Sequence, residues 1–146
     1  DYIIYTVHVY LKRRTAMNKY YYPAVFQKED GGFSVWMPDV PGCISQGDTL
    51  EEAVENIKDA FGLFVEEEKE NGREIQAASN PCDIELEPGQ FVALIEFDWT
   101  EYLRKNDTRT VKKTLTIPAW LNALAEEQHI NFSGVLKSAL IEKLHA

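Results

Sequence analysis

The stretch FSVWMPDVPGCISQGDTLEEAVENIKDAF, residues 33–61, changes its hydrophobic period along its length. Residues 33–37 alternate between apolar and polar side chains, as in a half-buried strand. A proline- and glycine-rich turn and a short strand at residues 43–47 follow. From Leu50 onward, apolar residues recur every three or four positions, as on one face of a helix. This change predicts an α+β fold in which a sheet packs against one helix.

The ends of the predicted helix carry recognisable signals. Thr49 and Glu52 have the spacing of a capping box, in which two side chains bond the free N–H groups of a first turn. Asn71 and Gly72 supply the stop signal. The helix is therefore expected to run from about residue 50 to residue 70.

Further strands are expected on both sides. Residues 20–26 are aromatic and β-branched, and Pro23 within them predicts an edge strand. Residues 90–99 are almost continuously apolar, which favours a central strand. Residues 17–99 thus predict a β-β-β-α-β domain, and residues 100–110 predict a short helical turn and linker with a break at Asn106–Asp107.

Charge is distributed unevenly along the 146 residues, whose formal net charge is −9. Residues 1–16 carry +2, residues 17–110 carry −12 from 8 basic and 20 acidic side chains, and residues 111–146 carry +1. Such a division suggests different partners for different segments. We interpret residues 1–16 as an extension from an upstream reading frame or from cloning, with an extra edge strand as the alternative.

Composition argues against several classes of protein. Apolar residues make up 45% of the chain, but no run approaches the roughly 18 residues that a membrane helix needs. Cys43 and Cys82 form no CxxC motif and the three histidines are scattered, so the sequence predicts neither a metal site nor a cofactor. Two unpatterned cysteines fit a reducing cytoplasm, and a single disulfide between them is the alternative.

The tail begins with TVKKTLTIPAWL, residues 110–121. It predicts a short strand stopped by Pro118, then a helix, and then a second helix with Asn131 as its N-cap. A single strand leaves its backbone groups unpaired, so it needs a second copy of the chain. The side chains predicted to form the shared dimer core are Leu115, Ile117, Trp120, Leu136 and Leu140.

The other face of this strand is suited to nucleic acid. A two-stranded antiparallel ribbon fits the major groove of DNA, where lysine and threonine side chains can contact base edges. Lys112, Thr114 and Thr116 share that outward face and are the expected base contacts. The N-terminus of the second helix is a candidate phosphate site. Its residues are Asn131, Ser133 and Gly134.

The order of these tail elements resembles a ribbon-helix-helix domain, the fold of many dimeric repressors. The first part of the chain resembles the N-terminal domain of HicB antitoxins. This second resemblance rests on Tyr22-Pro23, the Asp30-Gly31-Gly32 turn, PDVPGC at residues 38–43 and GDTLEEA at residues 47–53.

The resemblance implies an antitoxin of a HicA–HicB pair, found as a homodimer or tetramer. Its domain at residues 17–99 would be a partial RNase H-like fold that inhibits a small, basic, mRNA-cleaving ribonuclease toxin of the HicA type. Its domain at residues 111–146 would repress the operon by binding operator DNA. Such a protein is not an enzyme, has no catalytic residues and resides in the cytoplasm away from the membrane. Which residues contact the toxin is not predicted.

Two alternatives stand beside this one. The first is a dimeric ribbon-helix-helix repressor that has no toxin partner. The second is a metal-dependent nuclease, for which Asp39, Asp48 and Asp98 would be the candidate carboxylates. Turn and cap chemistry accounts for the first two of these side chains equally well.

Overall fold

The computed structural model describes residues 18–146, so the expected extension at residues 1–16 lies outside the described residues. The chain divides into two compact units. The front unit, as described, covers residues 18–106, and the tail unit covers residues 107–146.

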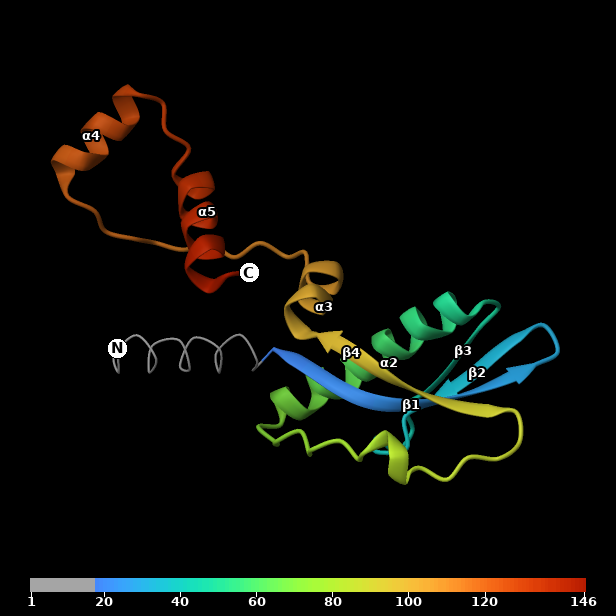
Figure 1. Cartoon of the computed structure of the whole chain (residues 1–146). Helices are drawn as coiled ribbons and strands as arrows, with labels where there is room; N and C mark the ends of the chain where they lie inside the picture. Colours follow the sequence, from blue (N-terminus) through green and yellow to red (C-terminus); the bar gives the residue numbers. More distant parts are fainter. Residues whose placement is uncertain (1–17) are drawn as a thin grey trace, which may run out of the picture. The chain divides into compact units, whose positions relative to one another are not determined.

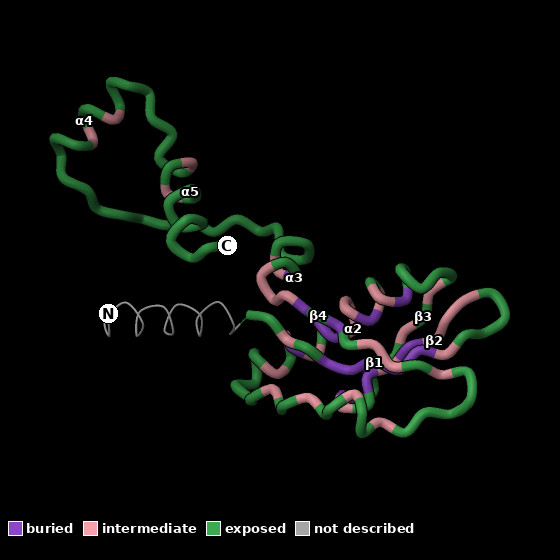
Figure 2. Tube along the Cα trace, viewed as in Figure 1, coloured by how far each residue is buried: buried purple, intermediate pink, exposed green. Residues whose placement is uncertain are grey.

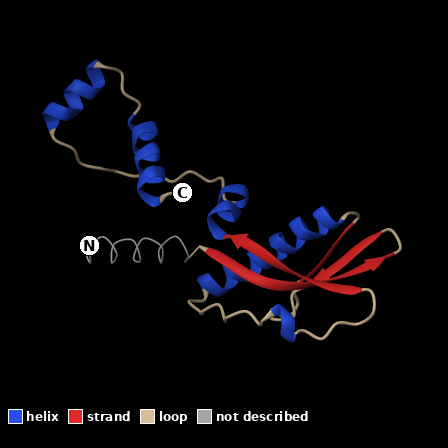
Figure 3. Ribbon diagram, in the orientation of Figure 1, coloured by secondary structure: helices blue, strands red, loops and turns tan. Residues whose placement is uncertain are grey.

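The front unit contains one antiparallel sheet with the strand order β3-β2-β1-β4 (Figure 3). Its strands are β1 (Lys19–Glu29), β2 (Gly32–Trp36), β3 (Ile44–Gly47) and β4 (Gln90–Asp98). Helix α2 (Leu50–Glu70) lies along one face of the sheet (Figure 1). The predicted α+β class and the β-β-β-α-β order are confirmed for this unit.

Helix α2 begins and ends where the sequence predicts. The Thr49 hydroxyl accepts a hydrogen bond from the Glu52 backbone N–H at 3.1 Å. The Glu52 carboxylate accepts one from the Asp48 backbone N–H at 2.8 Å, one residue earlier than in the standard capping box. At the other end, Asn71 is the C-cap and Gly72 has a φ of 65°, which glycine adopts readily.

The hydrophobic core lies between α2 and the sheet. Ala53, Ile57, Phe61 and Val65 project from α2 at helical spacing and are fully buried. The Phe61 ring is central, since its centroid lies 4.8 Å from that of Tyr22 and 5.1 Å from that of Phe97. This layer of aromatic and aliphatic contacts holds α2 on the sheet.

The structure reverses the expected positions of two strands. Strand β1, predicted at an edge, is central, and β4, predicted to be central, is an edge strand. Pro23 is tolerated because β2 pairs with β1 only from Val25 to Glu29, so Pro23 has a neighbouring strand on the β4 side alone. The apolar run of β4 does not reflect burial on both faces, because Leu94 is 55% exposed.

The linker predicted at residues 100–110 is largely helical. Helix α3 (Trp99–Asn106) follows β4 directly, and the Asp98 carboxylate accepts hydrogen bonds from the backbone N–H groups of Thr100 and Glu101. Tyr102 is buried against the core of the front unit. Helix α3 therefore belongs to this unit, and the division of the chain falls after Asn106.

The loop between α2 and β4 is tied to the rest of the front unit. It includes the 3₁₀ helix η1 (Pro81–Asp83). The Asp39 carboxylate accepts hydrogen bonds from the backbone N–H of Ser79 at 3.0 Å and from its hydroxyl. The Tyr22 hydroxyl donates to the Gln76 carbonyl. These bonds connect the PDVPG turn and β1 to the loop.

The tail unit contains two helices, α4 (Ala119–Glu127) and α5 (Phe132–Leu144). Residues 107–118 form no strand in the single chain and are drawn as loop in Figure 3. The strand predicted there is therefore absent from the isolated chain, because no second strand is present to accept and donate its backbone hydrogen bonds. Among residues 18–146, no helix has the length and apolar character needed to cross a membrane.

Candidate functional site

The tail unit exposes the side chains that the sequence assigns to a dimer core. No residue of α4 or α5 is buried, and Figure 2 shows this unit as exposed or intermediate throughout. Leu115 is 62% exposed, Trp120 is 66% exposed and Leu140 is 50% exposed. Ile117 is also exposed, and Leu136 is intermediate. The apolar side chains assigned to the dimer core are therefore uncovered in the single chain, and the dimer itself stays a prediction.

The predicted base-contacting residues lie in the segment before α4. Lys112, Thr114 and Thr116 are exposed, and all three belong to the stretch without regular structure. Their common outward face depends on a strand that a single chain does not form. Their assignment to DNA contacts therefore remains a prediction.

The turn between α4 and α5 is built by specific backbone bonds. His129 has a φ of 53°, in the left-handed region, and its N–H donates to the Glu126 carbonyl. The Ile130 N–H donates to the Ala125 carbonyl at 2.9 Å. This pair of bonds is the Schellman arrangement, here with histidine in the position that glycine usually occupies. It ends α4 and fixes the start of the short connection to α5.

The start of α5 differs in one respect from the prediction. Asn131 is the N-cap, as expected, and its side-chain oxygen accepts the Gly134 backbone N–H at 3.0 Å. The Gly134 N–H is therefore not free to bind a phosphate, because the cap already uses it. Within residues 18–146, the backbone N–H groups of Phe132 and Ser133 have no such acceptor.

The three carboxylates considered for nuclease chemistry each lie at a turn or at the start of a helix. Asp39 bonds Ser79, and Asp98 caps α3. Asp48 immediately precedes the N-cap of α2. Within residues 18–146, no three His, Cys, Asp or Glu side chains gather in a way that would hold a metal ion.

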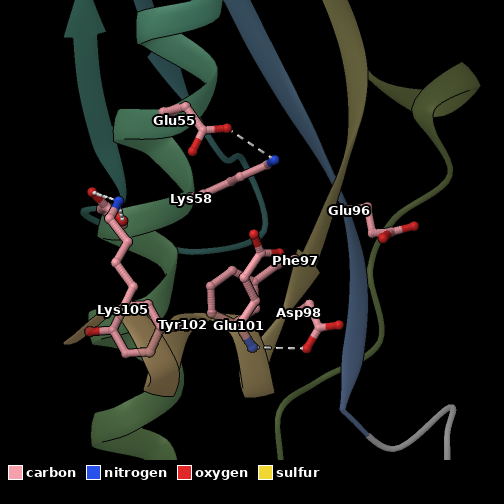
Figure 4. A pocket seen from close by; sticks show the side chains of 9 residues that line it. Glu55, Lys58, Glu96, Phe97, Asp98, Glu101, Tyr102 and Lys105 are labelled. Carbon is pink, nitrogen blue, oxygen red and sulfur yellow. Dashed lines mark hydrogen bonds and ion pairs between the residues drawn. The ribbon is translucent and has the colours of Figure 1, made fainter. Parts of the chain in front are cut away.

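A shallow pocket lies where α2, β4 and α3 meet (Figure 4). Its charged side chains are mostly neutralised in pairs. Lys105 contacts both Asp59 carboxylate oxygens, at 3.0 and 3.1 Å, and Lys58 lies 3.3 Å from Glu55. The hydrogen bond and charge of Asp59 raise the pKa of the Lys105 ammonium above its ordinary value. This arrangement fastens α3 to α2 and was not predicted from the sequence, because Lys105 and Asp59 are 46 positions apart.

The front unit is strongly acidic. Residues 18–106 contain 7 basic and 19 acidic side chains, whereas residues 107–146 contain 5 basic and 4 acidic ones. Among the ion pairs of the front unit, Arg73 lies 2.6 Å from Glu68 and 3.6 Å from Glu67. Among residues 18–146, most of these carboxylates have no cationic partner in an ion pair, so the front unit carries an excess of negative charge.

Comparison with known proteins gives a consistent result for both units. A family model described as the HicB-like antitoxins of bacterial toxin–antitoxin systems matches residues 22–140. A 14.9 kDa uncharacterised protein from the rep-hol intergenic region of Haemophilus phage HP1 is 35% identical over 104 residues. That match covers 68% of this chain and 74% of the phage protein.

Other similarities are shorter or structural. A UPF0150 protein of Synechocystis sp. is 48% identical over 48 residues, which cover 32% of this chain and 61% of that relative. The chain thus spans about three-fifths of that protein's length. Among solved structures, one chain of a toxin–antitoxin complex from Streptococcus pneumoniae superposes with a TM-score of 0.55 at 26% identity. The match covers 86% of this chain and 99% of that one.

Proposed function

Because this chain belongs to the HicB-like antitoxin family of bacterial toxin–antitoxin systems, we propose that it inhibits a HicA-like ribonuclease toxin and represses its own operon. The observation that carries the proposal is the extent of the family match. It begins in β1 of the front unit and ends in α5 of the tail unit, so it includes both parts of the expected layout. A protein of this family is regulatory rather than catalytic.

We assign toxin binding to the front unit on electrostatic grounds. A ribonuclease must attract RNA phosphates and is therefore expected to carry a basic surface. The front unit has 19 acidic side chains against 7 basic ones and is the electrostatic complement of such a surface. Complementary charge speeds encounter and favours the correct partner over others. The partial RNase H-like description of this unit is part of the same proposal.

We assign DNA binding to the tail unit, as a ribbon-helix-helix dimer. Two copies of the segment around Leu115 would supply each other with backbone partners, and the apolar side chains of α4 and α5 would become buried. Lys112, Thr114 and Thr116 would then project from the ribbon into the major groove. The free N–H groups at Phe132 and Ser133, next to the Asn131 cap, would approach a phosphate.

Two measurements test the proposal together. If a small basic reading frame lies next to this gene, its product should arrest growth alone and should not do so when this protein is co-expressed. The protein should also retard a DNA fragment from upstream of its own gene in a gel-shift assay. Retardation of the fragment without any protection from the neighbouring product would instead support a repressor that has no toxin partner.

A further inference from the structure

We propose that the sheet face opposite α2 is the docking surface for the basic toxin, with an apolar centre crossing all four strands. The inference rests on the proposed function, since it names the part of the front unit that the toxin contacts. It follows from the strand register, the exposure of individual side chains and the polar residues that border the face.

The face is defined by strand alternation. Successive side chains of a strand point to opposite faces, and Tyr22, Ala24 and Phe26 of β1 belong to the core under α2. Pro23 and Val25 therefore point away from α2. Tyr102 of α3 packs against Phe97, a member of the same core, so α3 also lies on the α2 side. Neither α-helix of the front unit covers the opposite face (Figure 1).

One continuous apolar row crosses this face. Ile44 of β3 is in register with Trp36 of β2, and Trp36 is in register with Val25 of β1. Val25 is in turn opposite Val92 of β4, so the row extends from one edge of the sheet to the other. The solvated face of an antiparallel sheet is usually polar, so an unbroken apolar row across all four strands points to a covered face.

A second apolar pair lies beside the row, where Pro23 is opposite Leu94. The outer members of the cluster are open to solvent, because Ile44 is 67% exposed and Leu94 is 55% exposed. In contrast, Pro23 and Val25 in the middle are almost completely buried by their neighbours. Ile44 and Leu94 thus offer exposed apolar surface on either side of a buried apolar middle, and exposed apolar surface of this kind marks an interaction site.

Polar side chains border the apolar surface at both ends. At one end, the Glu96 carboxylate accepts hydrogen bonds from Lys19 and from the Tyr21 hydroxyl, each at 2.8 Å. These bonds lower the pKa of Glu96 below its ordinary value, so it is ionised at neutral pH. At the other end, the Gln90 amide donates to the Gln27 side-chain oxygen at 3.0 Å. An apolar centre with a hydrogen-bonded rim is the usual anatomy of a protein interface.

The charge of the front unit identifies the occupant. Two copies of this face would bring together two units with 19 acidic and 7 basic side chains each, and they would repel one another. By strand alternation Glu96 of β4 and Glu29 of β1 share this face, and they extend the same negative sign to the rim. A basic protein with an apolar contact surface would match both the apolar centre of the face and its acidic rim. A second copy of this chain would match only the apolar centre.

The test uses the full-length protein with three single substitutions. Leu94→Lys and Ile44→Lys place a charge in the proposed surface, at positions already exposed to solvent. Leu63→Lys is the matched control, because Leu63 is 64% exposed but lies in α2 on the other side of the sheet. Binding to the purified product of the neighbouring reading frame is measured by calorimetry. Thermal melting shows whether each variant is folded. Binding to the operator fragment shows whether its tail unit is intact.

Both face variants should weaken binding by about tenfold or more, because each places a positive charge against the apolar contact surface of a basic partner, and Leu63→Lys should remain within about twofold of wild type. Side-chain footprinting of the unaltered proteins provides a second readout that needs no variant. In the complex, labelling should fall at Ile44 and Leu94 and stay constant at Leu63.

Three results would overturn the proposal. Wild-type affinity in both face variants, with no footprint at Ile44 and Leu94, would place the toxin elsewhere while leaving the proposed function intact. Unchanged toxin binding together with a halved particle mass in Leu94→Lys would assign the face to a second copy of the chain. Absence of binding by the wild-type protein itself would refute the toxin partner and the docking surface together.

Discussion

Gly62 of α2 leaves the space that the ring of Tyr102 from α3 occupies. A Cβ atom at Gly62 would overlap the Tyr102 ring, and Tyr102 is only 8% exposed. The same ring packs on Phe97 of β4, with centroids 5.6 Å apart. The close approach of these two residues therefore fixes α3 against both α2 and the sheet, at the place where the front unit ends.

Gly62→Ala should destabilise the front unit. At an unconstrained helix position this substitution would stabilise the protein by about 0.5–1 kcal/mol, because alanine is the better helix former. Here we expect the opposite sign, with a loss of about 1–3 kcal/mol from overpacking against Tyr102. Chemical denaturation measures the change. In a Tyr102→Ala background the clash is gone, so the same glycine substitution should be neutral or stabilising.

The two cysteines should differ sharply in reactivity. Burial raises the pKa of the Cys43 thiol to about 11, whereas Cys82 is exposed in η1. Since the thiolate is the reactive form, a thiol reagent at pH 8 should modify one cysteine in the native protein and two after denaturation. The unfolded chain releases the Cys43 proton at lower pH than the folded chain. Stability should therefore fall as pH rises from about 9 toward 11. Rapid modification of both native thiols would contradict this assignment.

Local signals in the sequence predicted the elements of the front unit well. The Thr49 cap and the Asn71–Gly72 stop act through bonds within one turn of the chain, so sequence spacing alone identifies them. The order of strands in the sheet was not predictable in this way. Pro23 indicated an edge, yet β1 is central because β4, which is distant in sequence, pairs along its other side. Pro23 is tolerated there because β2 ends opposite Val25.

The candidate site, too, could be predicted from local sequence signals only in part. The Asn131 cap was predicted, but its consequence for Gly134, whose N–H it occupies, requires the geometry of the turn. The apolar face around Trp36 was not predicted at all. Its residues come from four separate strands, and only the register places Ile44, Trp36 and Val25 in one line. Alternation within a single strand carries no information about that alignment.

Leu115→Asp should prevent the tail unit from pairing. In the proposed dimer this side chain enters a small shared core, where an unpaired carboxylate is costly. We expect a halved particle mass by light scattering at micromolar concentration and loss of operator binding. The front unit should keep its folded signature in thermal melting. A variant that remains dimeric would show that Leu115, which is 62% exposed in the single chain, also stays exposed in the assembly.

Replacing Lys112, Thr114 and Thr116 together with alanine should abolish recognition of the operator. Each base contact contributes on the order of 1–3 kcal/mol of discrimination, so three losses reduce binding to the non-specific level. The dimer should persist, because in the proposed ribbon these residues lie on the face opposite Leu115. Thr108→Ala, which lies before the predicted ribbon, is the control. Equal gel-shift affinity of the triple variant and wild type would show that the ribbon does not read the DNA.

A chain that ends at Asn106 should still neutralise the toxin but should no longer repress. The division after Asn106 leaves the core of the front unit complete, including α3 and the buried Tyr102. It also separates the acidic unit from a tail with 5 basic and 4 acidic side chains. Co-expression of this fragment with the toxin should restore growth, while a reporter driven by the operon promoter should remain fully active.

The same division predicts how toxin affects repression. In the full-length protein, the acidic unit should oppose DNA binding only weakly, because salt screens charges beyond about 8 Å at physiological ionic strength. A bound basic toxin would cancel that charge, so the complex should bind the operator at least as tightly as the antitoxin alone. Titration of toxin in a gel-shift assay measures the gain in operator affinity at two salt concentrations, and this gain should shrink as salt increases.

The growth test of the chain that ends at Asn106 decides between the two units. If growth arrest continues although this fragment is folded and abundant, the tail unit takes part in neutralisation. The assignment of one partner to each unit would then be incorrect.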